Sequence, residues 1–221
     1  MRSLFLALLV GPAWAQEFVE VPGPLPDDAF YRAVACAAEP GGDCRKPFIR
    51  WPTEKRRALA VSLASVPPGV PDYKRRLFEA ALEGALAELN RLDAGIALRR
   101  TDGPGDIDIH VVATPPGHVM AGTGIPALEG AVLPLARVAL RARDGEILSG
   151  IIAISAFARR REIASVFLEE ITQALGLMTD VRGAAYRRSL FSEDGNSVTR
   201  IEGQDADAIR RHYAARGEGD E

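Results

Sequence analysis

The sequence has few of the residues on which metal, nucleic-acid and membrane sites commonly depend. Its 221 residues include two cysteines and three histidines, and 30 acidic side chains outnumber 27 basic ones. With a net charge of −3 there is no basic excess to hold nucleic acid or anionic lipid, so we expect no nucleic-acid partner. The sequence also lacks a P-loop, a dinucleotide-binding glycine fingerprint and a Ser-His-Asp pattern, the common signatures of nucleotide-binding proteins and serine hydrolases.

The three histidines do not share a spacing that would bring them to one metal ion. His110 lies in a predicted strand, His118 lies in a loop rich in Pro and Gly, and His212 is near the C-terminus. Each position is more typical of a surface or hydrogen-bonded structural histidine than of a ligand. His118 is the one of most functional interest, because loops carry function more often than strand interiors do.

Long apolar runs are confined to the N-terminus. The apolar residues 4–10 are followed by the small-residue motif Ala13-x-Ala15, which predicts a secretory signal peptide over residues 1–15. A buried N-terminal strand is the alternative. Seven apolar residues are too few to span a membrane. No later segment approaches the necessary length, so we expect a periplasmic or secreted chain without a membrane span.

Cys36 and Cys44 are the only cysteines, and both follow the predicted signal peptide. They would meet an oxidising compartment, and the segment between them can turn back on itself, so we predict a disulfide. Two free thiols are the alternative, because a cysteine pair without a nearby histidine is a poor zinc site. We therefore divide the remaining chain into an N-terminal extension closed by the disulfide, residues 16–44, and one domain, residues 45–221.

Apolar periodicity predicts an α+β fold with a mixed, twisted sheet. Strands are predicted at 48–51, 58–63, 96–98, 106–112, 132–141 and 147–155, and helices at 28–37 and 72–92. The Pro- and Gly-rich segment 113–130 is predicted to be a long loop, and Asp144-Gly145 is a hairpin turn signal.

The stretch 167–180 is the central feature of the chain. It reads as the second half of an amphipathic helix that ends at Gly176, because glycine after the last periodic residue is a common helix stop. One apolar stripe consists of Ile163, Phe167, Ile171, Ala174 and Leu175. Another face gathers the polar residues Glu162, Glu169, Glu170 and Gln173.

This stretch resembles the zincin metallopeptidase signature H-E-x-x-H-x-x-G-x-x-H. Glu170 falls on the catalytic glutamate and Gly176 on the glycine. The three metal positions hold residues other than histidine, namely Glu169, Gln173 and Thr179, and Asp180 follows them. The motif E-E-[IL]-T-Q-x-L-G-L also resembles a motif of an uncharacterised family of secreted bacterial proteins, a domain of unknown function that looks zincin-like.

The resemblance implies a zincin-like architecture for residues 45–221. In such an architecture the sheet carries the long helix and the central motif helix, and a smaller C-terminal part folds back across the cleft. The Ser189-Leu-Phe191 segment resembles the Ser-x-Met turn of metzincins, with Phe191 at the methionine position. The segment 205–213 resembles their final helix.

The residues at the metal positions argue against classical zinc peptidase chemistry. Zinc prefers nitrogen and sulfur donors, and without it Glu170 has no acidified water to deprotonate. We expect no cofactor, and we interpret the chain as a secreted binding module for a protein or peptide ligand. The binding candidates are Glu169, Gln173, Thr179 and Asp180, and Glu170 is the catalytic candidate.

The alternative is a metal-dependent hydrolase with an unusual oxygen-ligated site. Glu169, Glu170 and Asp180 would then hold Ca²⁺, Mg²⁺ or Mn²⁺, which prefer oxygen ligands. A glycosidase-type carboxylate pair is weakly supported, because side chains at i and i+1 of a helix diverge. We predict that the Glu170 carboxylate points into the cleft and receives hydrogen bonds from Gln173, Thr179, Ser189 or a backbone N–H near Ser192.

Overall fold

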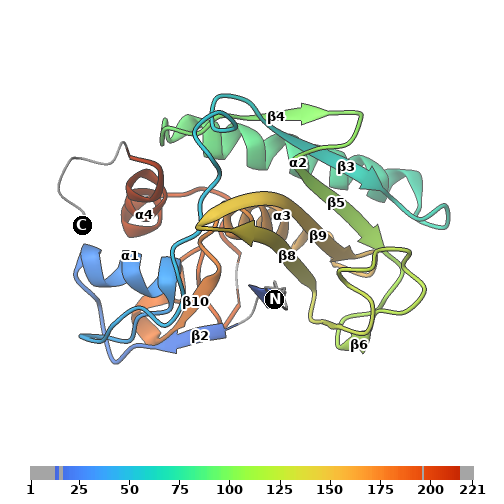
Figure 1. Ribbon diagram of the computed structural model, residues 1–221. Helices are drawn as coiled ribbons and strands as arrows, with labels where there is room; N and C mark the ends of the chain where they lie inside the picture. The colour runs from blue at the N-terminus through green and yellow to red at the C-terminus, as the bar shows by residue number, and fades with distance from the viewer. Residues whose placement is uncertain (1–12, 15–16, 196, 215–221) are drawn as a thin grey trace, which may run out of the picture.

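The computed structural model describes residues 13–14, 17–195 and 197–214 (Figure 1). Its centre is a six-stranded mixed sheet, which confirms the α+β class. The strand order is β1 (Ala13–Trp14), β8 (Ala136–Arg143), β9 (Glu146–Ser155), β5 (Ile107–Val112), β3 (Leu59–Ser65) and β4 (Leu98–Thr101). Apart from Ala13 and Trp14, the signal peptide predicted over 1–15 lies outside the described residues.

Four neighbouring strands, β4, β3, β5 and β9, run parallel, and β8 returns antiparallel to β9. The return is the predicted hairpin at Asp144 and Gly145, whose φ angles are 52° and 79°. Positive φ at both central residues matches the twist of the flanking strands, which is why Asp-Gly favours this turn. The hairpin places the start of β8 and the turn at opposite ends of one strand.

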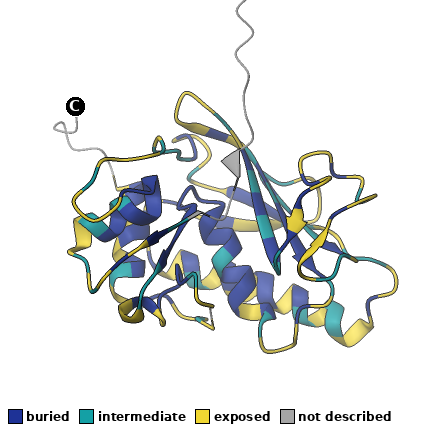
Figure 2. Cartoon of the chain, turned by 90° about the horizontal axis from the view of Figure 1, so that it is seen from below, coloured by how far each residue is buried: buried dark blue, intermediate teal, exposed yellow. Residues whose placement is uncertain are grey.

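Helices α2 (Asp72–Arg91) and α3 (Ile163–Gln173) lie on the same face of the sheet (Figure 1). Both present apolar residues at helical spacing, so each buries one stripe. Phe78 of α2 and Phe167 of α3 stack with their ring centroids 6.1 Å apart. Figure 2 shows the buried residues gathered between the sheet and these helices, and the exposed residues on the outer helix faces.

A second layer joins the two ends of the described chain. α1 (Asp27–Cys36) packs against α4 (Gly203–Tyr213), and β2 (Glu17–Glu20) pairs in parallel with β10 (Thr179–Arg182). A short 3-10 helix, η1 (Ala184–Tyr186), follows β10. Within the described residues no helix is both long and apolar enough to cross a membrane.

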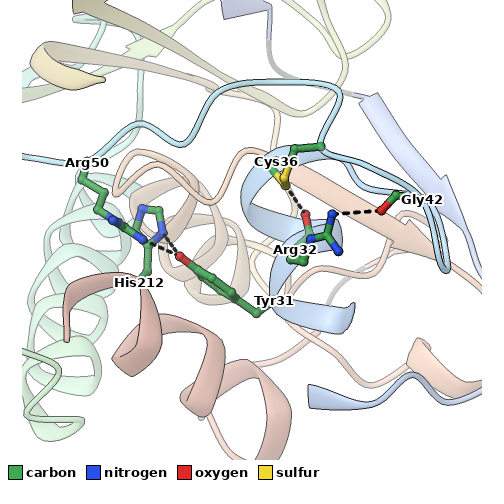
Figure 3. The surroundings of a disulfide bond; sticks show 7 residues. Tyr31, Arg32, Cys36, Gly42, Arg50 and His212 are labelled. Atoms are coloured by element: carbon green, nitrogen blue, oxygen red, sulfur yellow. Dashed lines mark hydrogen bonds between the residues drawn. A yellow bond between two sulfur atoms is a disulfide. The ribbon is translucent and has the colours of Figure 1, made fainter. Parts of the chain in front are cut away.

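The predicted disulfide is confirmed. Cys36 at the end of α1 is bonded to Cys44, and their Cα atoms are 5.1 Å apart (Figure 3). Across the same loop, the Arg32 guanidinium donates to the Gly42 carbonyl at 2.9 Å. The cross-link and this hydrogen bond fix the path by which the chain leaves α1.

Two predictions about the middle of the chain need correction. The predicted loop 113–130 contains β6 (His118–Val119), which pairs with β7 (Val132–Leu133). The predicted strand 132–141 is divided between β7 and β8, because Pro134 has no N–H for a continuous ladder. A small separate core of Met120, Leu128 and Leu133 explains why a Pro- and Gly-rich segment is ordered here.

The predicted strand 48–51 is also wrong. In this segment only an isolated bridge forms, between Arg50 and Glu146. Pro47 and Pro52 flank it, and proline at both ends removes the donors that a longer ladder would require. β4 begins at Leu98 and therefore lies later than the predicted strand 96–98.

Candidate acidic functional site

Helix α3 carries its polar residues into the protein. The expected polar face is only partly solvated: Glu170 is 7% exposed and Gln173 is 4% exposed, whereas Glu162 and Glu169 are half-buried. Phe167 and Ile171 bury the opposite stripe, so α3 is enclosed on both sides. A helix of this kind presents its few charged groups to an internal space, which makes them candidates for function.

The internal space is a cavity of about 270 Å³ between α3, the start of β8 and the strand β10. The apolar wall comes from Leu135 and Ala136 at the start of β8, and Ser192 adds a hydroxyl. All charged lining residues are acidic: Glu162, Glu169, Glu170, Asp180 and Glu193. We call this space the acidic cavity.

Glu170 is the most unusual of these groups. Its Oε2 atom is buried and has no hydrogen-bond partner among the described residues. Burial raises the pKa of Glu170 well above its ordinary value, and the negative charges of Glu169 and Asp180 raise it further. The positive charge of Arg137 opposes this increase. An unpaired charge here would cost several kcal/mol, so the site favours either a proton or a bound cation.

Asp180 is the second buried carboxyl of the cavity and is 5% exposed. Burial raises its pKa to about 7, and the charge of Glu193 adds to the effect. Gln173 Nε2 donates to Asp180 Oδ1 at 3.3 Å, which opposes it. Asp180 therefore changes its charge near neutral pH, where a free aspartate would already be ionised.

The turn between α3 and β10 brings these groups together. Gly176 has a φ of 105°, and a Cβ atom there would lie 2.1 Å from the Ile49 carbonyl oxygen. Only glycine fits this position, so the chain reverses there and returns as β10. Because strand residues alternate, Asp180 faces the acidic cavity while Thr179 lines a different, apolar pocket beside Met178.

The hydrogen-bond donors that we expected for Glu170 are used elsewhere. Gln173 serves Asp180, and Ser189 Oγ donates to Asp205 Oδ1 at 2.6 Å. The backbone N–H of Leu190 also donates to Asp205, at 2.6 Å. Asp205 belongs to α4, so this helix holds the Ser189-Leu-Phe191 turn in place. This role of Asp205 was not predicted from the sequence.

The structure brings Glu169, Glu170 and Asp180 to one cavity and adds Glu193, which sequence analysis missed. Glu193 follows the turn after β10, and only its pairing with that strand reveals its place: its N–H donates to the Val181 carbonyl at 3.1 Å. None of the three histidines lines the cavity. Within residues 13–14, 17–195 and 197–214, no group of three or more His, Cys, Asp or Glu side chains is arranged to hold a metal ion.

Comparison with known proteins assigns no activity. A family model described as Protein of unknown function (DUF2927) matches residues 28–216, which is most of the chain. A search of curated proteins finds no match.

Proposed function

We propose that this chain, which belongs to the family described as Protein of unknown function (DUF2927), is a secreted or periplasmic binding module whose acidic cavity receives a positively charged group of a protein or peptide ligand. The observation that carries the proposal is the buried, unpartnered Glu170 Oε2 in a cavity with no basic lining residue. An ammonium or guanidinium group would supply both the missing hydrogen bond and the missing charge.

Size and chemistry favour a side chain as the occupant. About 270 Å³ is enough for the end of a lysine or arginine, whose methylene groups would contact Leu135 and Ala136. Glu170 and Asp180 would each lose a proton on binding, because a neighbouring cation favours the ionised carboxylate. Binding would therefore release protons near neutral pH.

The edge of β8 offers a place for the backbone of the same ligand. β1 already pairs antiparallel with β8, with Ala13 opposite Leu140 and Trp14 opposite Ala139. An extended segment can thus add to this edge, which is a common mode of peptide recognition. Signal-peptide cleavage after Ala15 would remove β1 and leave the edge open to a partner.

A zincin-like scaffold without classical zinc peptidase activity is part of the proposal. The order β3, α2, β4, β5, β8, β9, α3 agrees with the strand, long helix, strands and motif helix that the resemblance implies. The disulfide supports an oxidising compartment. Glu169, Gln173 and Thr179 at the metal positions support the lack of zinc chemistry.

Calorimetric titration with three acetylated and amidated tripeptides, Ala-Lys-Ala, Ala-Arg-Ala and Ala-norleucine-Ala, tests the proposal. We expect at least one of the two cationic peptides to bind about tenfold or more tightly than the norleucine peptide. Glu170→Gln should remove this preference, and Glu54→Gln, which changes an exposed carboxylate, should keep it. Equal binding of all three peptides, or no binding of any of them, would overturn the proposal.

The second candidate is a hydrolase with an oxygen-ligated Ca²⁺, Mg²⁺ or Mn²⁺. One observation favours it: Glu169, Glu170 and Asp180 all line the acidic cavity, and they would have to move closer together to hold the ion, since the described residues form no ready metal site. Elemental analysis of the purified chain, before and after chelation, separates the two candidates. Stoichiometric metal whose retention is lost in Glu170→Gln would favour the hydrolase over the binding module.

A further inference from the structure

A second cavity, of about 720 Å³, lies at the opposite end of β8. One wall is the β8–β9 hairpin turn, residues 144–146, and another is the segment 48–57. Two hydrogen bonds join these walls: Arg50 N donates to the Gly145 carbonyl at 3.0 Å, and Ile147 N donates to the Arg50 carbonyl at 2.8 Å. Tyr213 and Ala214, at the end of α4, form a third wall of the cavity.

Arg50 is held in place and still has an unused donor. Its Nη2 donates to the Tyr31 hydroxyl at 2.7 Å, and that hydroxyl contacts His212 Nδ1 at 3.3 Å (Figure 3). His212 Nε2 in turn lies 3.0 Å from the Ile49 carbonyl oxygen. Arg50 Nε is buried and has no hydrogen-bond partner among the described residues. A buried donor of this kind calls for an acceptor that the protein itself does not provide.

Arg56 is also oriented by the protein. Its Nε donates to the Trp51 carbonyl at 2.8 Å, and its guanidinium carbon lies 5.2 Å from the centroid of the Tyr213 ring. These contacts fix the plane of the guanidinium, and no acceptor in the described chain contacts its two Nη atoms. Arg57, beside it, is exposed and has no carboxylate partner among the described residues. By contrast, Arg100 and Arg91 bind Glu83 and Glu88.

The acidic residues of this cavity lie at its rim. The Asp144 side chain is 93% exposed, and Glu146 is exposed as well. The other charged lining residues are Arg50, Arg56 and Arg57, and the charges of Arg50 and Arg56 also help burial to lower the pKa of His212, outside the lining, to about 3. The two guanidinium groups therefore act on the same interior space, and no acidic side chain neutralises them there.

We propose that this basic cavity binds a small molecule through an oxyanion, either a phosphate or a carboxylate, with Arg56 and Arg57 donating to the oxygens and Arg50 Nε donating once its side chain turns toward the cavity. Guanidinium forks match both oxyanions in geometry and charge. The volume suits a ligand larger than the oxyanion alone. The site shares no lining residue with the acidic cavity, so either proposal can fail without the other.

The test is calorimetric titration of the disulfide-bonded chain with inorganic phosphate, with citrate and with glucose as the neutral control. We expect phosphate or citrate to bind and glucose not to, and the tighter of the two anions identifies the oxyanion. The double variant Arg56→Gln, Arg57→Gln should bind the anion at least tenfold more weakly. The matched control is Arg160→Gln, Arg161→Gln, which removes the same charge from exposed positions that line neither cavity.

Three results would overturn the proposal: no binding of either anion, unchanged binding by the Arg56, Arg57 variant, or an equal loss in the control variant. The last result would show a general charge effect and no site. Arg57→Gln alone, at an exposed position, serves if the double variant does not fold, and a loss of about threefold or more is then expected.

Discussion

The two cavities at the ends of β8 are opposite in charge and alike in construction. At the start of the strand, carboxylates line a cavity together with Glu170, whose Oε2 is buried; near the hairpin turn, arginines line a cavity together with Arg50, whose Nε is buried. Among the described residues these two atoms are the buried side-chain nitrogen or oxygen atoms without a hydrogen-bond partner. Buried polar groups in folded proteins are nearly always satisfied, and both of our binding proposals start from these two exceptions.

The cavities differ in how their charged groups are supported. The acidic residues Glu169, Glu170 and Asp180 lie on the regular elements α3 and β10, whereas the basic groups lie on the irregular segment 48–57 that follows the disulfide loop. Both sites depend on the folded chain, and the basic site depends in addition on the hydrogen bonds and the disulfide that hold an irregular segment in place. The following predictions use this difference, from the largest expected effect to the smallest.

Removal of the disulfide should have the largest effect and should affect binding at the two cavities differently. The bond joins two residues with a sequence separation of 8 and so restricts the unfolded chain. The Cys36→Ala, Cys44→Ala variant should therefore lose about 2–3 kcal/mol of unfolding free energy. Anion binding should weaken, because the disulfide loop leads directly into the segment 48–57 that carries Arg50. Binding of the cationic peptide should be retained. Urea unfolding and calorimetry measure both effects. Equal weakening of both binding activities would contradict the difference in support.

Neutralising Glu170 should stabilise the protein at high pH. Its pKa is raised in the folded state, so its protonation favours folding, and that contribution is lost as the pH rises through the folded pKa. Glu170→Gln should therefore increase the unfolding free energy by roughly 2 kcal/mol at about pH 8, with little change at about pH 4. Urea unfolding at the two pH values is the measurement. A variant less stable than the parent at both pH values would show that the ionised carboxylate has a partner.

Asp180 should give a smaller effect centred nearer to neutrality. Because its folded pKa is about 7 and its ordinary value is 3.8, its stabilising contribution is complete below about pH 4 and is lost as the pH rises to about 7. The parent should therefore lose stability between about pH 4 and about pH 7, and Asp180→Asn should reduce that loss by roughly 1–2 kcal/mol. A pH series of thermal melts measures it. An unaltered slope would assign the pH dependence to another group.

Tyr31→Phe should have the smallest effect and act only at the basic cavity. It removes the hydroxyl between Arg50 and His212, which we expect to lower the unfolding free energy by about 1 kcal/mol. Arg50 would lose one fixed contact, so anion affinity should fall a few-fold. Peptide binding at the acidic cavity should stay at the parent value. A change in peptide binding would mean that the two cavities communicate.

Much of the fold could be predicted from the sequence because its elements have clear periods. The apolar stripe of α3, the Asp144-Gly145 turn and the alternation in 106–112 each specify one local structure. The errors lie where that local logic fails: Pro134 divides a run that looks continuous, and 48–51 looks like a strand but its flanking prolines prevent a ladder.

The sites were harder to predict, because they depend on contacts between distant parts of the chain. The helical period brought Glu169, Glu170 and Gln173 together, but it could not show that the C-terminal part covers them. Glu193 joins the acidic cavity through the pairing of its segment with β10. The basic cavity depends on a hairpin turn, a loop and the end of α4, which are adjacent only after folding.

The pairing of β2 with β10 and of α1 with α4 has a consequence for the time course of folding. β2 and α1 find their main element partners, β10 and α4, late in the chain, so these contacts cannot form until nearly the whole chain has been synthesised. Closing so long a loop is slow, and sheet contacts of high sequence separation form late. A ribosome-bound chain stalled before residue 203 should therefore have the sheet and α2 but leave α1 accessible to protease.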